Sequence, residues 1–424
     1  MVKHPPPSHP KRRDYGLVMA IVSILAFLVL VSPSFLQHFY PRKYNEYFPL
    51  LADAGNYLAI GGFLLISFLS KDKGSLSLMA LLGLFCIGLL ALLQLAAHQF
   101  MGRFSDVDLF YTGQMLLCFL AFWLLPSTLR TGEGTKLYPL FLILFTIGLC
   151  VYSLLTEWEM YLGLAGLRSA YDLNIRSIFY NRNSLGQLIF IAWLCVFLLR
   201  PRLGGLQMMV LALFALVLTS TLSRAALLGV IVFLFFYFLM NYSAKPNFYR
   251  ILLFVGFLFT LLLLYKPSLF SYLTRILFRG YVGDTGRSGA WIYGLKLMDA
   301  PGWLMGLGID TSQTALQQSS IGLQHFHSYY IGNLVAGGLL LSCAHLFLFL
   351  EFVGLYQRLH RSDPSFATVY ISSVFAFYAY ALFDNATFLI PGYEGVYITL
   401  LLLTLPLSHL EKTDVPLYYR KELS

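Results

Sequence analysis

The stretch at residues 203–241, LGGLQMMVLALFALVLTSTLSRAALLGVIVFLFFYFLMN, is apolar almost throughout, and its polar side chains concentrate in the TSTLSR sequence at 219–224. A helix that crosses a bilayer needs about 20 predominantly apolar residues. The stretch is therefore long enough for two membrane-spanning helices that are joined by a tight hairpin at the polar cluster. Such a pair predicts an all-α protein that crosses the membrane several times.

The composition of the whole chain agrees with this. Of its 424 residues 58% are hydrophobic and only 12% are charged, and the mean hydropathy is +0.71. So few charges cannot solvate the surface of a soluble domain, and the composition therefore indicates an integral membrane protein. The net charge of +9 does not indicate a nucleic-acid partner, because no basic run is longer than Lys11-Arg12-Arg13. The five cysteines are scattered and lack metal-ligand spacing.

Further apolar stretches predict twelve spans in a single polytopic domain that covers residues 1–424. The predicted spans lie near 15–36, 48–69, 75–97, 106–125, 137–156, 183–199, 204–221, 224–241, 249–265, 329–350, 366–383 and 393–409.

Basic residues distribute unevenly between the two sides that these spans define. The N-terminus, the C-terminal tail and every loop on one side carry Lys or Arg, such as Lys71, Arg130 and Arg358. The short loops of the opposite side hold only four basic residues, which are Arg42, Lys43, Arg103 and Arg224. Because short cytoplasmic loops carry an excess of Lys and Arg, both termini are predicted to be cytoplasmic.

Two connections on the outer side are long, at 157–182 and 266–328. Loops of this length without a fold of their own are uncommon unless they are functional. Within the larger loop, RSGAWIYGLKLM at 287–298 predicts a short helix with Trp291, Leu295 and Met298 on one face. The outer face is therefore the predicted place of the functional site.

Arg224 stands at the outer hairpin, against the general bias of basic residues. A cation near hydrocarbon is costly unless it is paired or solvated, and an arginine that snorkels to the interface is one reading. The other interpretation is an anion site, since further arginines lie in the two long outer loops and guanidinium groups suit phosphate oxygens. These further arginines include Arg168, Arg176, Arg182, Arg275, Arg279 and Arg287. Outer carboxylates such as Asp384 offer ion-pair partners, so both readings stay open.

His325 and His327 stand where the tenth predicted span begins. On a helix they would point roughly 160° apart and could not face one cavity in the same way. In an extended segment they could form a zinc pair, but no outer cysteine or carboxylate cluster completes a metal shell, so no metal is expected. His327 and Ser328 begin the helix, where the dipole disfavours imidazolium. A neutral imidazole can act as a general base, although an interfacial histidine is also compatible with a structural role.

Three segments share an order, a spacing and a predicted outer position. They are Ser223-Arg224 at the start of a span, Arg287 and Trp291 with Pro301 and Gly306-Leu307-Gly308 in the larger loop, and His327-Ser328-Tyr329-Tyr330 with Leu334 and Gly337-Gly338. Together they resemble the O-antigen ligase and polymerase superfamily of bacterial envelope glycosyltransferases. Asn181-Arg182-Asn183 and Asp384 also fit, and the resemblance covers roughly residues 175–385. Ser328, where many members have Asn, and Tyr330, at an apolar position, depart from the pattern.

The resemblance implies an enzyme of the Gram-negative inner membrane. It would transfer O-antigen polysaccharide from undecaprenyl pyrophosphate to a sugar hydroxyl of lipid A–core at the periplasmic face, without cofactor or metal and with inversion. His327 would be the base, and Arg224, Arg287 and Arg182 would bind the pyrophosphate. Supporting roles fall to Asp384, Ser328 and Arg176. The loops at 157–182 and 266–328 would then be periplasmic, and the larger one would carry part of the active site.

Three other activities remain as alternatives. An O-antigen polymerase and a protein O-oligosaccharyltransferase share the architecture, but the compact chain and its single large loop after the ninth span favour the ligase. A transporter of an anionic substrate is the alternative from another class. Against it, the charges collect at one membrane face and paired broken helices are not evident in the sequence.

Overall fold

The computed structural model describes residues 15–39, 48–69, 76–128, 133–165, 175–179, 181–200, 204–242, 287–323, 325–384, 402–403 and 405–406, and these contain helices but no strand. The described helices are α1 (Gly16–Phe39), α2 (Phe48–Leu69), α3 (Leu78–Met101), α4 (Asp106–Thr128), η1 (Glu133–Lys136), α5 (Leu137–Thr156), α6 (Trp158–Ala165), α7 (Arg182–Leu199), α8 (Gly205–Thr221), α9 (Arg224–Tyr242), α12 (Arg287–Leu297), α13 (Ala300–Met305), α14 (Ile309–Gln318), α15 (Tyr329–Ser362) and α16 (Pro364–Tyr380).

Seven described helices are long and apolar enough to cross a membrane, and the predicted helical multi-pass membrane protein agrees with them. The number of twelve spans and the cytoplasmic position of both termini stay predictions. The ninth predicted span, at 249–265, lies outside the described residues, and so does the twelfth, at 393–409, apart from 402–403 and 405–406.

The hairpin predicted at 219–224 is confirmed. Helix α8 ends at Thr221 and α9 begins at Arg224. Leu222 between them has a positive φ of 56°, which reverses the chain. The hydroxyls of Ser220 and Thr221 donate to the carbonyls of Leu216 and Leu218, so the polar cluster satisfies part of its hydrogen bonding locally.

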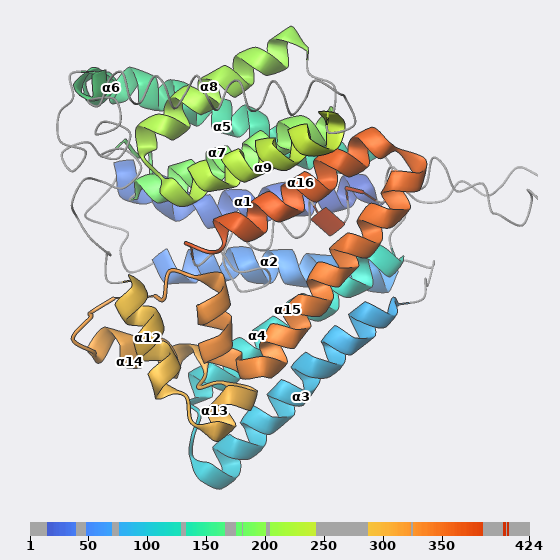
Figure 1. Ribbon diagram of the computed structural model, residues 1–424, viewed down its shortest axis with the longest axis vertical. Coiled ribbons are helices and arrows are strands. Elements are labelled where there is room, and N and C mark those ends of the chain that lie inside the picture. The colour runs from blue at the N-terminus through green and yellow to red at the C-terminus, as the bar shows by residue number, and fades with distance from the viewer. Residues whose placement is uncertain are drawn as a thin grey trace, which may run out of the picture.

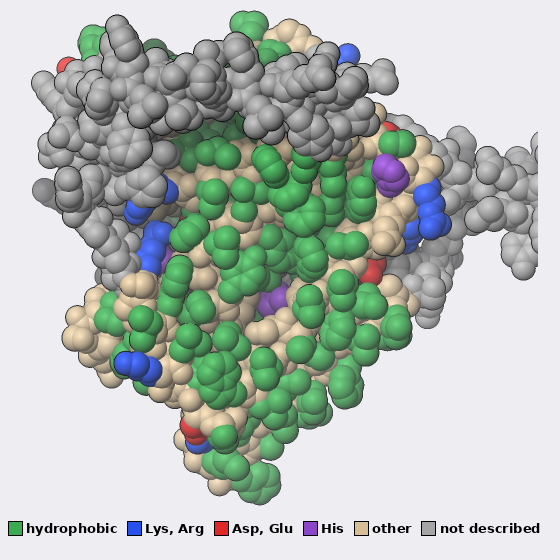
Figure 2. All heavy atoms as spheres, viewed as in Figure 1, with side chains coloured by type: hydrophobic (Ala, Val, Ile, Leu, Met, Phe, Trp, Pro, Cys, Tyr) green, Lys and Arg blue, Asp and Glu red, His purple; other side chains and the backbone are tan. Residues whose placement is uncertain are grey.

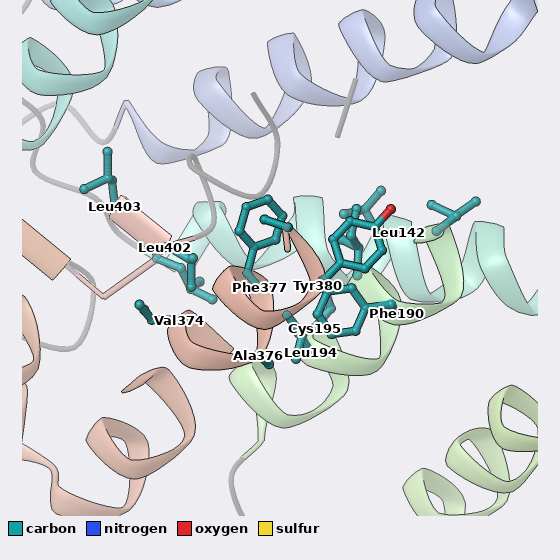
Figure 3. Packing of buried hydrophobic residues seen from close by; sticks show 14 of the residues in the cluster. Leu142, Phe190, Leu194, Cys195, Val374, Ala376, Phe377, Tyr380, Leu402 and Leu403 are labelled. Atoms are coloured by element: carbon teal, nitrogen blue, oxygen red, sulfur yellow. The ribbon is translucent and has the colours of Figure 1, made fainter. Parts of the chain in front are cut away.

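Helix α7 is the centre of the packed core. Every residue from Leu185 to Leu198 is buried, as expected of a helix that is apolar on all sides. It contacts α5, α8, α9 and α16, and Phe190 stacks on Tyr380 of α16 with ring centroids 5.3 Å apart. Figure 3 shows this packing around Phe190, Cys195 and Phe377.

The other helices surround this centre. In Figure 1, α3, α4 and α15 run at an angle to α7, α9 and α16, while the short helices α12, α13 and α14 gather at one end of the molecule. That end lies beside the α8–α9 hairpin and the end of α16, all of which were predicted to face outward.

The tenth predicted span differs from the structure, because α15 is broken at Gly338. Gly338 has φ 62° and ψ −158°, a conformation that favours glycine. The rings of Tyr329 and His345 lie 5.0 Å apart, whereas sixteen residues of straight helix would separate them by about 24 Å. The first arm of α15 (329–337) therefore folds back beside the second arm (339–362), and the two form a V.

The second arm also extends further than expected. It continues to Ser362, and α16 begins at Pro364, so the connection predicted at 351–365 is wrong in its extent. The side chain of Asp363 accepts from the backbone N–H of Phe366 at 3.0 Å and caps α16. The basic residues of this region thus lie on helix instead of in a loop.

Candidate functional site

The helix predicted at 287–298 is confirmed as α12, and it holds the histidine segment in place. Trp291 donates its indole N–H to the carbonyl of Phe326 at 2.7 Å. Phe326 is buried in a small outer cluster with Ala290, Met298 and Val335. A side chain at Gly294 would collide with the Phe326 ring, so the segment that carries both histidines is fixed against α12.

Two glycine motifs of the sequence meet at the break in α15. The break removes helical partners from the carbonyls before it, and those of Val335 and Ala336 accept from the N–H groups of Leu307 and Gly308 at 2.9 and 3.0 Å. A Cβ on Gly306 would collide with the backbone of Ala336, and one on Gly338 with the backbone of Leu304. Residues 304–308 of the larger outer loop are therefore interlocked with α15 at its break.

Polar contacts fasten the same loop to the outer ends of α3 and α4. The buried carboxylate of Asp108 accepts from the N–H groups of Asp310 and Thr311 at 2.8 and 3.2 Å and so caps α14. Asp299 caps α13 and pairs with Arg103, which lowers the pKa of Asp299 through the hydrogen bond from the guanidinium.

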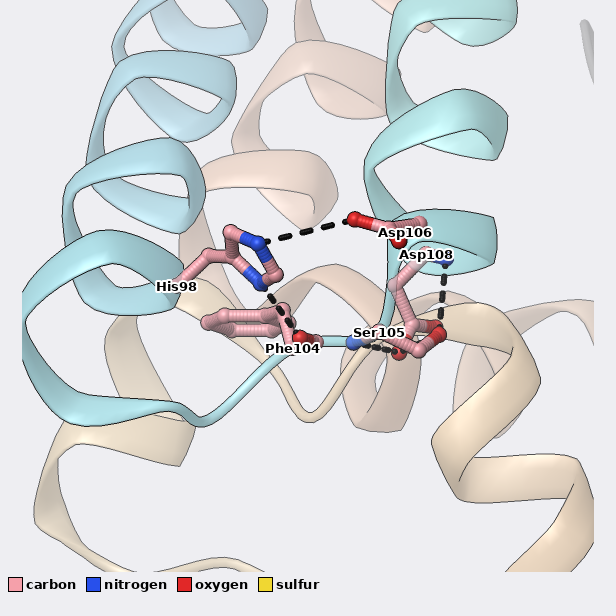
Figure 4. A network of polar contacts seen from close by, with 5 residues as sticks. All are labelled: His98, Phe104, Ser105, Asp106 and Asp108. Carbon is pink, nitrogen blue, oxygen red and sulfur yellow. Dashed lines mark hydrogen bonds and ion pairs between the residues drawn. The ribbon is translucent and has the colours of Figure 1, made fainter.

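The α3–α4 connection is itself held by hydrogen bonds. His98 contacts the carbonyl of Phe104 at 2.6 Å and lies 3.5 Å from Asp106, as Figure 4 shows beside Ser105 and Asp108. These contacts order the connection between α3 and α4, and the contacts of Arg103 and Asp108 join that connection to the larger loop, so both lie at one end of the molecule.

His327 is half-buried at this end, and its backbone has a positive φ of 51°. Burial lowers the pKa of the imidazole most, nearby Arg287 lowers it further, and Asp384 opposes both. These influences favour the neutral form. The cause differs from the expected helix dipole, because the helix begins at Tyr329 with Ser328 as its N-cap, and His327 precedes the helix.

His325 belongs to the same cluster as His327. Its ring centroid lies 6.2 Å from that of His327, and burial lowers its pKa while Asp384 raises it. Of the two geometries that the sequence left open, the structure has the non-helical one, because residues 325–327 precede α15 and can turn both rings to one side. The Nδ1 atom of His325 is buried without a hydrogen-bond partner among the described residues.

Arg287 and Asp384 reach this cluster from two other elements. Arg287, the first residue of α12, donates to the carbonyl of Phe383 at 3.1 Å. Asp384 follows α16 and accepts from the hydroxyl of Tyr380 at 2.6 Å. The start of α15 is anchored to the same place, because the N–H of Tyr329 donates to the carbonyl of Ala381 at 3.0 Å. The structure thus brings together His325, His327, Arg287 and Asp384.

Arg224 lies at the same end of the bundle, at the start of α9. Helices α9 and α16 pack against each other, with the rings of Phe236 and Phe375 stacked 4.6 Å apart. Arg224 precedes Phe236 by twelve residues on α9, and Tyr380, the last residue of α16, follows Phe375 by five. At about 1.5 Å per residue, the start of α9 and the end of α16 lie on the same side of this ring pair, about 18 Å and about 8 Å from it. The side chain of Arg224 is half-buried.

Arg182 begins α7 next to this hairpin. Gly186, one turn further along α7, packs so closely on Ser223 that a Cβ there would collide with it. The first turn of α7 therefore lies against the start of α9. Figure 2 shows Lys and Arg side chains gathered at this edge of the molecule, to the left of the view, with a histidine beside them.

Arg176 and Ser328 are described by their local backbone contacts. The N–H of Arg176 donates to Glu157 at 3.2 Å, as does that of Ser177, so Glu157 fixes a short segment of the second outer loop at the end of α5. Ser328 is buried as the N-cap of α15, but its side chain makes no capping hydrogen bond.

Within the described ranges, no three His, Cys, Asp or Glu side chains cluster closely enough to hold a metal ion. No protein-family model matches the chain, and no curated protein matches it. The candidate site therefore rests on its own geometry, which combines a histidine favoured in its neutral form with Asp384 and Arg287, while Arg224 and Arg182 begin helices at the same end of the bundle.

Proposed function

We propose that the protein is a membrane glycosyltransferase that moves a glycan from a polyprenyl pyrophosphate to a hydroxyl acceptor. The observation that carries the proposal is the cluster around His327. The His325 ring lies 6.2 Å from its ring, Arg287 is bonded to the carbonyl of Phe383 next to Asp384, and burial together with Arg287 favours the neutral form of His327. A neutral imidazole beside guanidinium groups suits a reaction in which a proton leaves one reactant while negative charge develops on another.

The proposed reaction is a single inverting displacement. The acceptor hydroxyl gives its proton to the free ring nitrogen of His327 as its oxygen bonds to the anomeric carbon of the donor sugar. The bond from that carbon to the pyrophosphate breaks, and the polyprenyl pyrophosphate leaves with the electron pair. Arg287, Arg224 and Arg182 stabilise the charge on the leaving group. Asp384 stabilises the imidazolium that forms, consistent with its effect on the pKa of His327.

The preferred substrates follow from the resemblance of the motifs to O-antigen ligases. The donor is undecaprenyl-pyrophosphate-linked O-antigen, the acceptor is lipid A–core, and the site faces the periplasm of a Gram-negative inner membrane. Purified protein should transfer glycan between these two lipids in the presence of EDTA. If folded protein with an unaltered His327 shows no transfer between these two lipids, this pair of substrates is rejected.

A deletion strain separates the related activities. Loss of a ligase leaves core without O-antigen and causes lipid-linked polymer to accumulate. Loss of a polymerase instead leaves core that bears one repeat, and loss of a protein O-oligosaccharyltransferase leaves lipopolysaccharide unchanged. Complementation with His327→Asn tests whether the phenotype depends on the proposed base.

The broken helix α15 favours a transporter as the second candidate function. Broken helices in transporters place half-helix ends at substrate sites within the membrane, and the first arm of α15 has such an end at Tyr329. Proteoliposomes that take up an anionic sugar phosphate without any glycan transfer would favour this function over the transferase.

A further inference from the structure

A groove of about 600 Å³ occupies the V between the two arms of α15 and is closed on one side by α16. Its wall is mostly aromatic and aliphatic, with Tyr330 and Phe349 among the lining residues. Figure 2 shows a histidine in a hollow of the hydrophobic face, over the region of α15. The groove therefore opens where the hydrocarbon of a bilayer would contact the protein.

Two polar side chains in the wall of this groove are unsatisfied. Asn333 is 3% exposed and His345 is 5% exposed. Neither the amide of Asn333 nor either ring nitrogen of His345 has a hydrogen-bond partner among the described residues. In hydrocarbon each unsatisfied polar group costs free energy, because no water is present to replace the missing partner.

The unsatisfied groups define the chemistry that fits the groove. Asn333 offers N–H donors and an oxygen acceptor, and a neutral imidazole at His345 offers one of each. A bare hydrocarbon chain satisfies none of these groups, and an ester carbonyl can only accept. A hydroxyl or a secondary amide can both donate and accept, and either group occurs on acyl chains close to their polar end.

We propose that the groove binds the chain of a lipid that carries a hydroxyl or amide group within the hydrocarbon region, hydrogen-bonded by Asn333 and His345. The terminal torsion of an asparagine is soft, so its amide can turn toward the groove without a backbone change. The V itself is held open by the interlocked glycines at Gly306 and Gly338. The binding is independent of the chemistry proposed for His327, so either can fail alone.

Photocrosslinking to the full-length protein in nanodiscs of ester phospholipids tests the proposal. The probe is a 3-hydroxyacyl amide with a diazirine at the chain end, and its matched partner is the same chain as a methyl ester without the hydroxyl. The hydroxyacyl amide should label peptides from 329–349 about tenfold more efficiently, equivalent to about 1.4 kcal/mol. Equal labelling by both probes, or labelling elsewhere only, would overturn the proposal.

Two variants locate the selectivity. Asn333→Leu and His345→Phe keep the volume and apolar character of the wall, so chain binding should remain while the preference for the hydroxyacyl amide is lost. His345→Gln retains a donor and an acceptor and guards against misfolding, and it should keep most of the preference. Leu216→Ala, at an exposed position of α8, is the remote control. A preference that survives in both Asn333→Leu and His345→Phe would exclude these side chains as the binding groups.

Discussion

At residue 327 the backbone is left-handed, with φ 51°, a conformation that histidine and asparagine adopt more readily than most residues. This makes His327→Asn a better test of the proposed base than alanine, because asparagine tolerates the backbone and cannot accept a proton at neutral pH. Glycan transfer should fall at least about 100-fold, the usual contribution of a general base. The thermal unfolding midpoint should stay within a few degrees.

His325→Asn is the matched variant of the neighbouring histidine. The ring of His325 lies 6.2 Å from that of His327, where it can influence the pKa of the base without accepting the proton itself. Glycan transfer should therefore fall much less in His325→Asn than in His327→Asn. If His325→Asn loses as much activity as His327→Asn while both proteins fold, the assignment of His327 alone as the base is wrong.

The two charged neighbours of His327 predict opposite changes in the pH profile of transfer. The base must be neutral, and its pKa lies below the ordinary 6.5, so activity should be level near pH 7 and fall in acid. Arg287 lowers this pKa and Asp384 raises it. Arg287→Gln should therefore move the acid limb to higher pH, and Asp384→Asn should move it to lower pH. The measurement is the rate of transfer at saturating substrate as a function of pH. If the acid limbs of the two variants moved in the same direction, the electrostatic assignment would be contradicted.

At the scale of the elements, the break in α15 depends on glycines that meet a neighbouring backbone. Gly338→Ala adds a methyl group against the carbonyl of Leu304 at a residue with a positive φ, so it should destabilise the fold by about 2 kcal/mol or more. Gly354→Ala, further along α15 where nothing lies within 4 Å, is the matched control and should be neutral or stabilising. Thermal unfolding in detergent compares the two.

Asp108 is the other element-scale contact, because it caps α14 from a buried position on α4. Asp108→Ala leaves the N–H groups of Asp310 and Thr311 without their partner and should cost about 2 kcal/mol or more. Asp106→Asn changes a carboxylate whose side chain is 95% exposed and should have little effect. Protease sensitivity of the larger loop, measured on both variants, reports whether α14 has come loose.

For the whole molecule, sidedness can be tested with a membrane-impermeant maleimide. Ser288, on α12, and Gln357, on the second arm of α15, are both exposed and lie near opposite ends of the spans. Ser288→Cys should be labelled in intact cells with a permeabilised outer membrane, and Gln357→Cys only after the inner membrane is opened. The parent protein corrects for the native cysteines, and the reverse labelling pattern would invert the predicted topology.

The amino-acid sequence predicts much of this architecture, since the length of apolar runs is a requirement of the bilayer. The span expected at 224–241 corresponds to α9 (Arg224–Tyr242), and the helix expected at 287–298 to α12. The break at Gly338 is not predictable in this way, because a glycine inside an apolar run is compatible with a straight helix. Its conformation is set by contact with residues 304–308, which is a tertiary effect.

The V in α15 bears on how the chain enters the membrane during synthesis. Its first arm is too short to cross a bilayer and ends in carbonyls that the larger loop satisfies. Residues 304–308 must therefore reach their place before this arm can settle below the surface. Insertion of α15 should be a late, two-step event, in which the second arm crosses first and the first arm follows once the loop has docked.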